Sequence, residues 1–319
     1  MSQDRNGFPP AVNGANGRHT GPKEVPDRPL APSSHEVYLA DARDLSFIPD
    51  ASVHLVVTSP PYFNLKKYAS DADKQMGDIH EYEQFLFELD KVVGECARVL
   101  VAGGRVCCVL GAVTIARRNG GRHHVLPLPS DIQVRSRQLG LDNLTPIMWH
   151  KVSNIVLEAS NSSRFLGKPN LPNGIVKNDL ETIVMLRKPG GYRKPTPAME
   201  QASFINNEEY FKWFLPVWSD ISGTSTKEHP APYPVGLAYR LIRMFSFVGD
   251  TVLDPFLGTG TTCRAAMAAG RNSIGIEVEP SYLELTARKL SRVPLGVDIS
   301  FHRDAPYSSP SFSADGARR

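Results

Sequence analysis

The stretch that most constrains the fold is residues 251–262, which read Thr-Val-Leu-Asp-Pro-Phe-Leu-Gly-Thr-Gly-Thr-Thr. This pattern predicts a buried strand, a Gly-x-Gly turn and a helix that begins near Thr262. Glycines at such a turn let backbone N–H groups approach a ligand, which then faces a helix N-terminus. A Walker loop would need a lysine here, and a dinucleotide fingerprint would need a third glycine where Cys263 stands. The turn therefore predicts a different kind of ligand site, with a purely structural turn as the alternative.

A second junction of strand and turn lies far upstream. The apolar run 53–57 predicts a buried strand, and Ser-Pro-Pro-Tyr follows it after one threonine. Ligands of open α/β sheets bind beyond the carboxyl ends of the strands, and the proline rings stiffen this turn. Ser59 offers a hydroxyl, Pro60 a carbonyl and Tyr62 a flat ring. This set suits a planar heterocycle that bears an amino group, and a proline-rich turn serving only the core is the alternative.

Alternating strand and helix patterns predict an α/β fold around a mostly parallel sheet. Asp78 and Glu81 suggest a capping box, and Gly103-Gly104 is expected to end the helix that follows. Pro234 suits the first turn of another helix. Strands are expected over 36–40, 105–110, 144–151, 182–187, 251–253 and 272–276. The expected apolar face of the first helix comprises Phe85, Leu89, Val92, Val93, Cys96, Val99 and Leu100.

The bulk properties fit one α/β enzyme with an inserted region: 319 residues, 41% hydrophobic, with a net charge of +3. The four cysteines form no CxxC pair and no Cys/His spacing suited to zinc. We therefore expect a reduced, cytosolic protein without a metal site. No apolar run approaches the roughly 20 residues of a membrane helix, and the N-terminus has no signal-peptide core.

Composition divides the chain into five segments. Residues 1–34 are rich in Pro, Gly, Asn and Ser and are expected to form a disordered leader, and 303–319 a flexible tail. Residues 35–151 and 216–302 are expected to form a catalytic half and a cofactor-binding half of one domain. Between them, 152–215 is expected to be a small target-recognition insertion, because long loops inside compact folds are usually functional. An ordinary structural insertion is the alternative.

Basic side chains gather in the stretch 117–137 and in the insertion. Contacts of such side chains with DNA phosphates would make binding sensitive to salt. A solvated basic face is the alternative. The candidate DNA-binding residues are Arg117, Arg118, Arg122, Arg164, Lys168, Lys177, Arg193 and Lys194.

The two turns, in this order, resemble the beta group of S-adenosylmethionine-dependent DNA amino-methyltransferases. Between them stands Lys-Glu-His-Pro-Ala-Pro-Tyr-Pro at 227–234, and the glycine turn is followed one βα unit later by an acid. The resemblance covers residues 36–292. It implies a Rossmann-like methyltransferase with a doubly wound sheet, an antiparallel hairpin strand and S-adenosylmethionine as the cofactor. The catalytic residues that it implies are Ser59, Pro60, Pro61 and Tyr62. The implied cofactor-binding residues are Asp41, Lys227, His229, Pro230, Ala231, Asp254, Pro255, Phe256, Gly258, Gly260, Thr261 and Glu277, although Asp41 could instead cap a helix.

The Thr-Ser-Pro-Pro-Tyr form resembles enzymes that methylate the N4 amine of cytosine, whereas adenine-N6 enzymes more often carry Asp in place of Ser59. Methylation at cytosine carbon 5 is disfavoured, because no Pro-Cys pair supplies a thiol nucleophile. We therefore expect a cytosine-N4 DNA methyltransferase, either solitary or part of a restriction-modification system. An adenine-N6 enzyme and a non-catalytic DNA-binding module are the alternatives.

This function requires the two turns to meet at neighbouring strand tips. Ser59 and the Pro60 carbonyl would accept the amine hydrogens of a flipped-out base, and Tyr62 would stack on it. The expected partners are double-stranded DNA, a second copy of the chain and a restriction endonuclease that acts on the same site. The expected location is the cytoplasm of a bacterial or archaeal cell.

Overall fold

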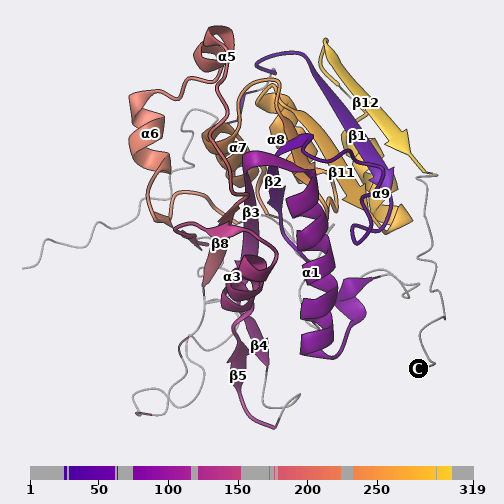
Figure 1. Cartoon of the computed structure of the whole chain (residues 1–319), viewed down its shortest axis with the longest axis vertical. Coiled ribbons are helices and arrows are strands. Elements are labelled where there is room, and N and C mark those ends of the chain that lie inside the picture. The colour runs from indigo at the N-terminus through magenta and orange to yellow at the C-terminus, as the bar shows by residue number, and fades with distance from the viewer. Residues whose placement is uncertain are drawn as a thin grey trace, which may run out of the picture.

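The computed structural model describes residues 25–26, 29–61, 63, 75–115, 121–151, 172, 176, 179–223, 233–291 and 293–303. These residues form a mostly parallel sheet with helices on both faces and antiparallel strands at one side (Figure 1), which confirms the expected α/β class. The strands are β1 Ser33–Leu39, β2 Val53–Thr58, β3 Leu100–Gly111, β4 Val113–Ile115, β5 His124–Leu126, β6 Asp142–Asn143, β7 Ile147–His150, β8 Leu180–Arg187, β9 Val217–Trp218, β10 Thr251–Asp254, β11 Asn272–Glu277 and β12 Val297–His302. The helices are η1 Met76–Asp78, α1 Tyr82–Val99, α3 Leu128–Gln138, α5 Pro197–Ala202, α6 Asn207–Trp213, α7 Val235–Phe245, α8 Thr261–Ala268 and α9 Pro280–Lys289.

The strands of the main sheet follow the order β12-β1-β11-β10-β2-β3-β8-β7-β9, with β6 paired to β8. Neighbours from β12 to β3 are parallel, while β8 runs antiparallel to both β3 and β7. β4 and β5 form a separate hairpin beyond the end of β3. Parallel neighbours end at the same edge of a sheet, so the turns after β1, β2, β10 and β11 gather there.

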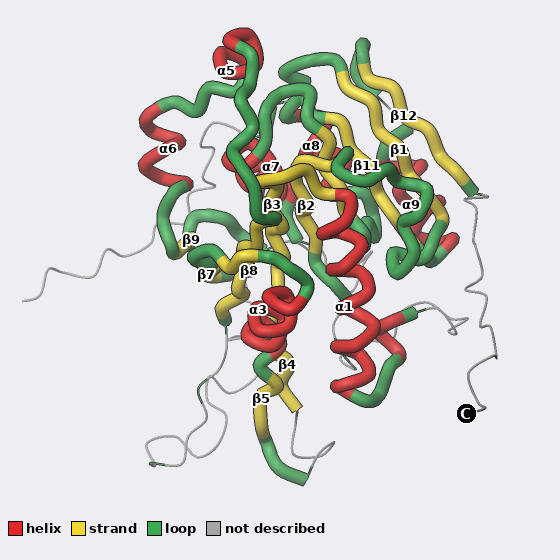
Figure 2. The backbone as a smooth tube through the Cα atoms, in the orientation of Figure 1, coloured by secondary structure: helices red, strands yellow, loops and turns green. Residues whose placement is uncertain are grey.

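Apolar side chains fill both faces of the sheet. Along β3, Cys108 and Leu110 pack with α1 and α3, whereas Cys107 and Val109 pack with α7 and α8. This alternation arises because successive side chains of a strand point to opposite faces. Figure 2 shows α1 and α3 on the near side of the sheet and α7 and α8 behind it. Of the expected apolar face of the first helix, all residues but Val93 are buried.

The expected boundaries of α1 are wrong at both ends. Glu81 immediately precedes the helix and makes no side-chain capping hydrogen bond, so Asp78 and Glu81 form no capping box. The helix gives way directly to β3 at Leu100, and Gly103 lies inside that strand. Gly103 has a φ of 76°, and a Cβ there would stand 2.8 Å from the carbonyl oxygen of Gly191. This glycine is needed for the close approach of the segment after β8 and does not end the helix.

The sheet includes an edge strand, β12, that the sequence pattern does not predict. Polar residues such as Asp298 and Ser300 interrupt its apolar ones, and its register is set by pairing with β1. β1 begins at Ser33, and the backbone N–H of Leu30 donates to the carbonyl of Ala268 at 3.3 Å. Residues 30–34 therefore belong to the folded domain, although the sequence places them in the disordered leader 1–34.

Within the described part of the chain, none of the helices combines the length and the apolar character needed to cross a bilayer. All four cysteines are buried free thiols.

A buried arginine fastens α7 to the segment around β9. The Arg240 side chain is 0% exposed and pairs with Asp220, with Nη1 to Oδ1 at 3.1 Å and Nη2 to Oδ2 at 2.8 Å. Its guanidinium carbon lies 5.7 and 4.7 Å from the ring centroids of Trp213 and Trp218. We expect Arg240→Ala to lower the free energy of unfolding by about 2–4 kcal/mol, because it removes a fully buried cation, leaves Asp220 with the exposed Lys212 as its partner, and empties the space beside two indoles. Denaturant unfolding monitored by circular dichroism measures this loss.

The matched control is Lys212→Ala. Lys212 pairs with the same Asp220 oxygen at 3.0 Å, but its side chain is 51% exposed, so its removal should cost less than about 1 kcal/mol. Equal losses for the two variants would contradict the assignment of Arg240 as the buried anchor.

Candidate active site

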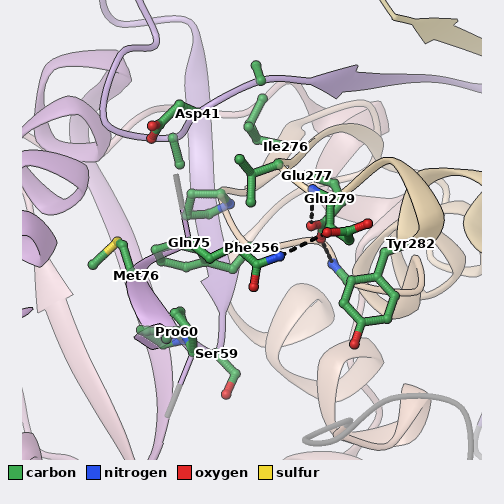
Figure 3. A pocket seen from close by; sticks show the side chains of 17 residues that line it. Asp41, Ser59, Pro60, Gln75, Met76, Phe256, Ile276, Glu277, Glu279 and Tyr282 are labelled. Carbon is green, nitrogen blue, oxygen red and sulfur yellow. Dashed lines mark hydrogen bonds between the residues drawn. The ribbon is translucent and has the colours of Figure 1, made fainter. Parts of the chain in front are cut away.

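The two turns that the sequence singles out share one cavity. β2 and β10 are parallel neighbours, with Leu55 beside Val252 and Val56 beside Leu253, so both turns leave the same edge of the sheet. A cavity that is open to solvent lies at this edge (Figure 3), and the space within it, open solvent included, is about 690 Å³. Its lining consists of Ala40, Asp41, Ala42, Ser59, Pro60, Pro61, Gln75, Met76, Gly77, Pro255, Phe256, Gly258, Ile276, Glu277, Val278, Glu279 and Tyr282.

The catalytic turn contributes Ser59, Pro60 and Pro61 to this lining. Ser59 is the first residue after β2. Side chains of this strand pack into the core on both faces of the sheet, which fixes the point at which the catalytic turn begins. Tyr62, the fourth expected catalytic residue, lies outside the described residues, as do the expected cofactor residues Lys227, His229, Pro230 and Ala231.

The glycine turn contributes Pro255, Phe256 and Gly258. Gly260 and Thr261 do not line the cavity: Gly260 precedes α8 with a φ of 82°, and Thr261 is the first residue of that helix. A Cβ on Gly260 would stand 2.9 Å from Cγ2 of Thr286 in α9. The second glycine therefore allows α9 to pack against the turn.

Glu277 ends β11 and combines a cavity position with deep burial. Its Oε2 accepts the backbone N–H of Gly258 at 2.7 Å, and its Oε1 accepts that of Glu279 at 2.9 Å. The side chain thus fixes the glycine turn relative to β11. Burial raises the pKa of Glu277 to about 7, although these hydrogen bonds oppose the rise. The ionised carboxylate is able to accept hydrogen bonds from hydroxyl groups of a ligand in the cavity.

Asp41 lines the cavity beyond the end of β1, with its carboxylate held by Arg43. Both carboxylate oxygens accept from the Arg43 guanidinium, and Oδ1 also accepts the backbone N–H of Arg43 at 3.0 Å. The residues after Asp41 form turns and no helix. Of its two proposed roles, the helix cap is therefore excluded, and the cavity position agrees with a role in cofactor binding.

Asp254, by contrast, lies behind the cavity and does not line it. Its side chain is 1% exposed, and its oxygens accept from Thr58 Oγ1 at 2.7 Å, the Phe256 N–H at 3.0 Å, Tyr233 OH at 3.0 Å, and Thr262 Oγ1. Burial raises the pKa of Asp254, and these donors oppose the rise. The expected contact of this acid with a cationic cofactor amine has no geometric support.

Several cavity residues escape sequence analysis. Gln75 comes from the segment before η1, and its Nε2 donates to Glu279 Oε2 at 2.9 Å across the cavity (Figure 3). No local pattern marks Gln75 as functional. Glu279 and Tyr282 follow the predicted acid at the start of α9, so their nearness to Glu277 in the sequence could have identified them.

The candidate DNA-binding residues do not share one surface. Arg122 is exposed on the segment that leads into β5, in the hairpin beyond the carboxyl end of β3 and thus at the edge that carries Ser59. Arg193 instead pairs with Asp250, which precedes β10, so it and Lys194 lie at the opposite edge of the sheet. The other five candidates, Arg117, Arg118, Arg164, Lys168 and Lys177, lie outside the described residues.

Comparison with solved structures defines the class of protein. The structure of TTHA0409, described as a DNA modification methylase from Thermus thermophilus and complexed with S-adenosyl-L-methionine, matches with a TM-score of 0.71 and 46% identity, over 86% of this chain and 100% of that one. PvuII DNA methyltransferase (cytosine-N4-specific) matches with a TM-score of 0.54 and 22% identity, over 82% of this chain and 89% of that one, which shows the fold alone. The fold is that of an S-adenosylmethionine-dependent methyltransferase.

Comparison of sequences defines the family. The family model described as DNA methylase, which covers N6 and N4 enzymes, matches residues 53–288. Type II methyltransferase M.MjaI of Methanocaldococcus jannaschii is 35% identical over 303 residues, which cover 84% of this chain and 96% of that protein. M.MthZI of Methanothermobacter thermautotrophicus is 34% identical over 288 residues, 81% of this chain and 77% of that protein. The chain therefore belongs to the N6/N4 DNA methylase family and is a site-specific DNA methyltransferase.

Proposed function

We propose that this enzyme transfers the methyl group to the exocyclic N4 amine of cytosine in double-stranded DNA. The observation that carries the proposal is Ser59, a neutral hydroxyl at the cavity-lining catalytic turn, where adenine-N6 enzymes more often carry Asp. Adenine-N6 methylation is the second candidate, because the same scaffold serves both reactions.

In the proposed reaction the protein activates an amine whose lone pair is delocalised into the ring. The Ser59 hydroxyl and the Pro60 carbonyl would accept hydrogen bonds from its two N–H groups and draw the nitrogen toward tetrahedral geometry. The lone pair would then point at the methyl group. In-line transfer would form the N–C bond as the S–C bond of the donor breaks, and the methylated amine would release one proton to solvent; positioning and fixed dipoles would accelerate this step. The base must leave the helix for this, at a cost of a few kcal/mol, and Tyr62 is proposed to stack on it.

The described residues fit S-adenosylmethionine, which supplies an activated methyl group when bound. Glu277 would accept the ribose hydroxyls, and Gly258 lets the backbone lie close to the ligand. Asp41, Phe256 and Glu279 lie around the same cavity (Figure 3). The lining also contains apolar groups, such as Ile276, that suit a planar base.

The DNA contacts are proposed on narrower grounds. Arg122 lies at the catalytic edge and is the strongest described candidate for phosphate contact. Within the expected insertion 152–215, β8 belongs to the main sheet and Arg193 lies at the edge opposite Ser59, so only the part before β8 is proposed to read the target sequence. The type II names of the relatives support a restriction-modification role with a companion endonuclease, and a dimer would extend the footprint on DNA.

Mass spectrometry of nucleosides tests the proposed target. DNA from a host without DNA methyltransferases is incubated with the purified protein and S-adenosylmethionine, then digested to nucleosides. We expect N4-methylcytosine to appear only with active enzyme. N6-methyladenine as the sole product would replace the proposal with its second candidate.

A further inference from the structure

Polar groups of this chain surround the carboxylate of Asp254. Its Oδ1 accepts from the hydroxyl of Thr58 and from the N–H of Phe256. Its Oδ2 lies within hydrogen-bond distance of the hydroxyls of Tyr233 and Thr262, which also contact each other. Asp254 and the three residues whose hydroxyls contact it are each at most 8% exposed, so water does not compete for these positions. The cluster is complete without a ligand.

The cluster joins the two halves of the site. Thr58 is the last residue of β2 and precedes Ser59, while Asp254 is the last residue of β10 and precedes Pro255. The hydrogen bond between them, 2.7 Å long, therefore connects the catalytic turn to the cofactor turn one residue before each reaches the cavity. Thr262 adds the first turn of α8, and Tyr233 adds the segment that leads into α7.

We propose that Thr58 and Asp254 are positioning residues, which set the separation between the base-binding turn and the methyl donor. The inference rests on the proposed catalytic role of the Ser59 turn. It assigns Asp254 no contact with the cofactor amine, and it makes Thr58 a determinant of the transfer rate although Thr58 does not line the cavity.

The hydrogen bonds that hold the cofactor turn explain why loss of the Thr58 hydroxyl should lower the rate of methyl transfer without weakening cofactor binding. Gly258 is fixed by its N–H to Glu277 and by its carbonyl, which accepts from Thr286 Oγ1 at 3.0 Å. Neither bond involves Thr58, so its loss leaves this part of the cavity in place. The catalytic turn, by contrast, loses the side-chain hydrogen bond that Thr58, the residue before Ser59, makes to the cofactor turn. A misplacement of about 1 Å can slow a positioned reaction by about 10²-fold.

The test compares single-turnover methyl transfer with cofactor affinity in Thr58→Val, Thr58→Ala and Thr58→Ser. Labelled S-adenosylmethionine reports methyl groups on plasmid DNA from a host without methyltransferases, and calorimetry gives the cofactor Kd. Val and Ala remove the hydroxyl, and we expect each to slow transfer at least about tenfold, with the Kd within about twofold of the wild type. Ser keeps the donor and should retain the rate within about threefold.

Thr182→Val in β8 is the matched control, since Thr182 lies in the same sheet and its hydroxyl, within the described part of the chain, bonds only to the weak acceptor Met148 Sδ at 3.7 Å. It should leave the rate unchanged. Wild-type rates in Thr58→Val and Thr58→Ala, or a Kd that weakens in step with the rate, would overturn the inference. If both fail to fold while Thr58→Ser is active, the role is structural and the inference also fails. The label counts methyl groups on any base, so the product analysis decides the proposed cytosine target separately.

Discussion

Replacement of Ser59 by alanine is expected to slow methyl transfer by about 10²–10³-fold and to leave the affinity for S-adenosylmethionine unchanged. The magnitude is that found when one preorganised hydrogen-bonding group is removed from a transition state. The amine nitrogen gains charge as the methyl group arrives, and its hydrogens then bind acceptors more strongly than in the ground state. Ser59 supplies one of the two proposed acceptors from the rim of the cavity. Single-turnover kinetics and calorimetry measure the two quantities.

The control for this prediction is Ser46→Ala, at an exposed serine in the turns between β1 and β2. It should keep the wild-type rate. Two results would contradict the assignment of Ser59. In the first, Ser59→Ala transfers methyl groups at the wild-type rate. In the second, Ser59→Ala is slower only because it binds the cofactor more weakly.

The second large effect concerns Glu277→Gln, which is expected to weaken cofactor binding by roughly 10–150-fold. Hydrogen bonds to a charged group contribute about 1.5–3 kcal/mol, and Gln replaces the charged acceptor by a neutral amide. The Gln side chain has one acceptor oxygen in place of two, so only one of the backbone N–H groups of Gly258 and Glu279 keeps its hydrogen bond, and the turn loosens. Calorimetric titration at pH 8 measures the affinity. Glu284→Gln on the exposed side of α9 is the control and should bind normally.

The same residue predicts a pH dependence that the variant removes. Burial raises the pKa of Glu277 to about 7 from its ordinary value of 4.5, so the free protein takes up a proton as the pH falls through 7. A ribose hydroxyl donates to the ionised carboxylate, so wild-type affinity should rise with pH through about 7 and level off above it. Stability follows the opposite sign: between 4.5 and 7 the folded state binds more protons than the unfolded state, so this group's contribution falls as the pH rises. A flat affinity profile in the wild type would contradict this role.

Sequence analysis identifies those parts of the site in which chemistry and local structure lie together. Gly258 and Glu277 follow strands with clear apolar patterns, and Ser59 stands in a turn stiffened by two prolines. Each of these could be placed from a window of a dozen residues. The parallel class of the sheet then requires their turns to share an edge, which the cavity confirms.

Long-range partners are what the sequence does not reveal. Asp254 looks like a ligand-binding acid in its own motif, but its partner Thr58 is 196 positions away and satisfies it internally. Arg193 looks like a phosphate contact until its pairing with Asp250 places it at the far edge. A charged side chain has the same appearance in a sequence whether it faces a ligand or another residue of the chain. Only the register of the strands distinguishes the two.

The position of β1 between β11 and β12 affects how the enzyme matures during synthesis. Both partners of β1 come from residues 272–302, and Asp41, at the end of β1, forms one wall of the cavity. The first strand therefore leaves the ribosome long before either neighbour exists. A nascent chain that already contains the catalytic turn still lacks the residues after β10 and β11 and those of α9, so the cavity is complete only after these elements have been translated.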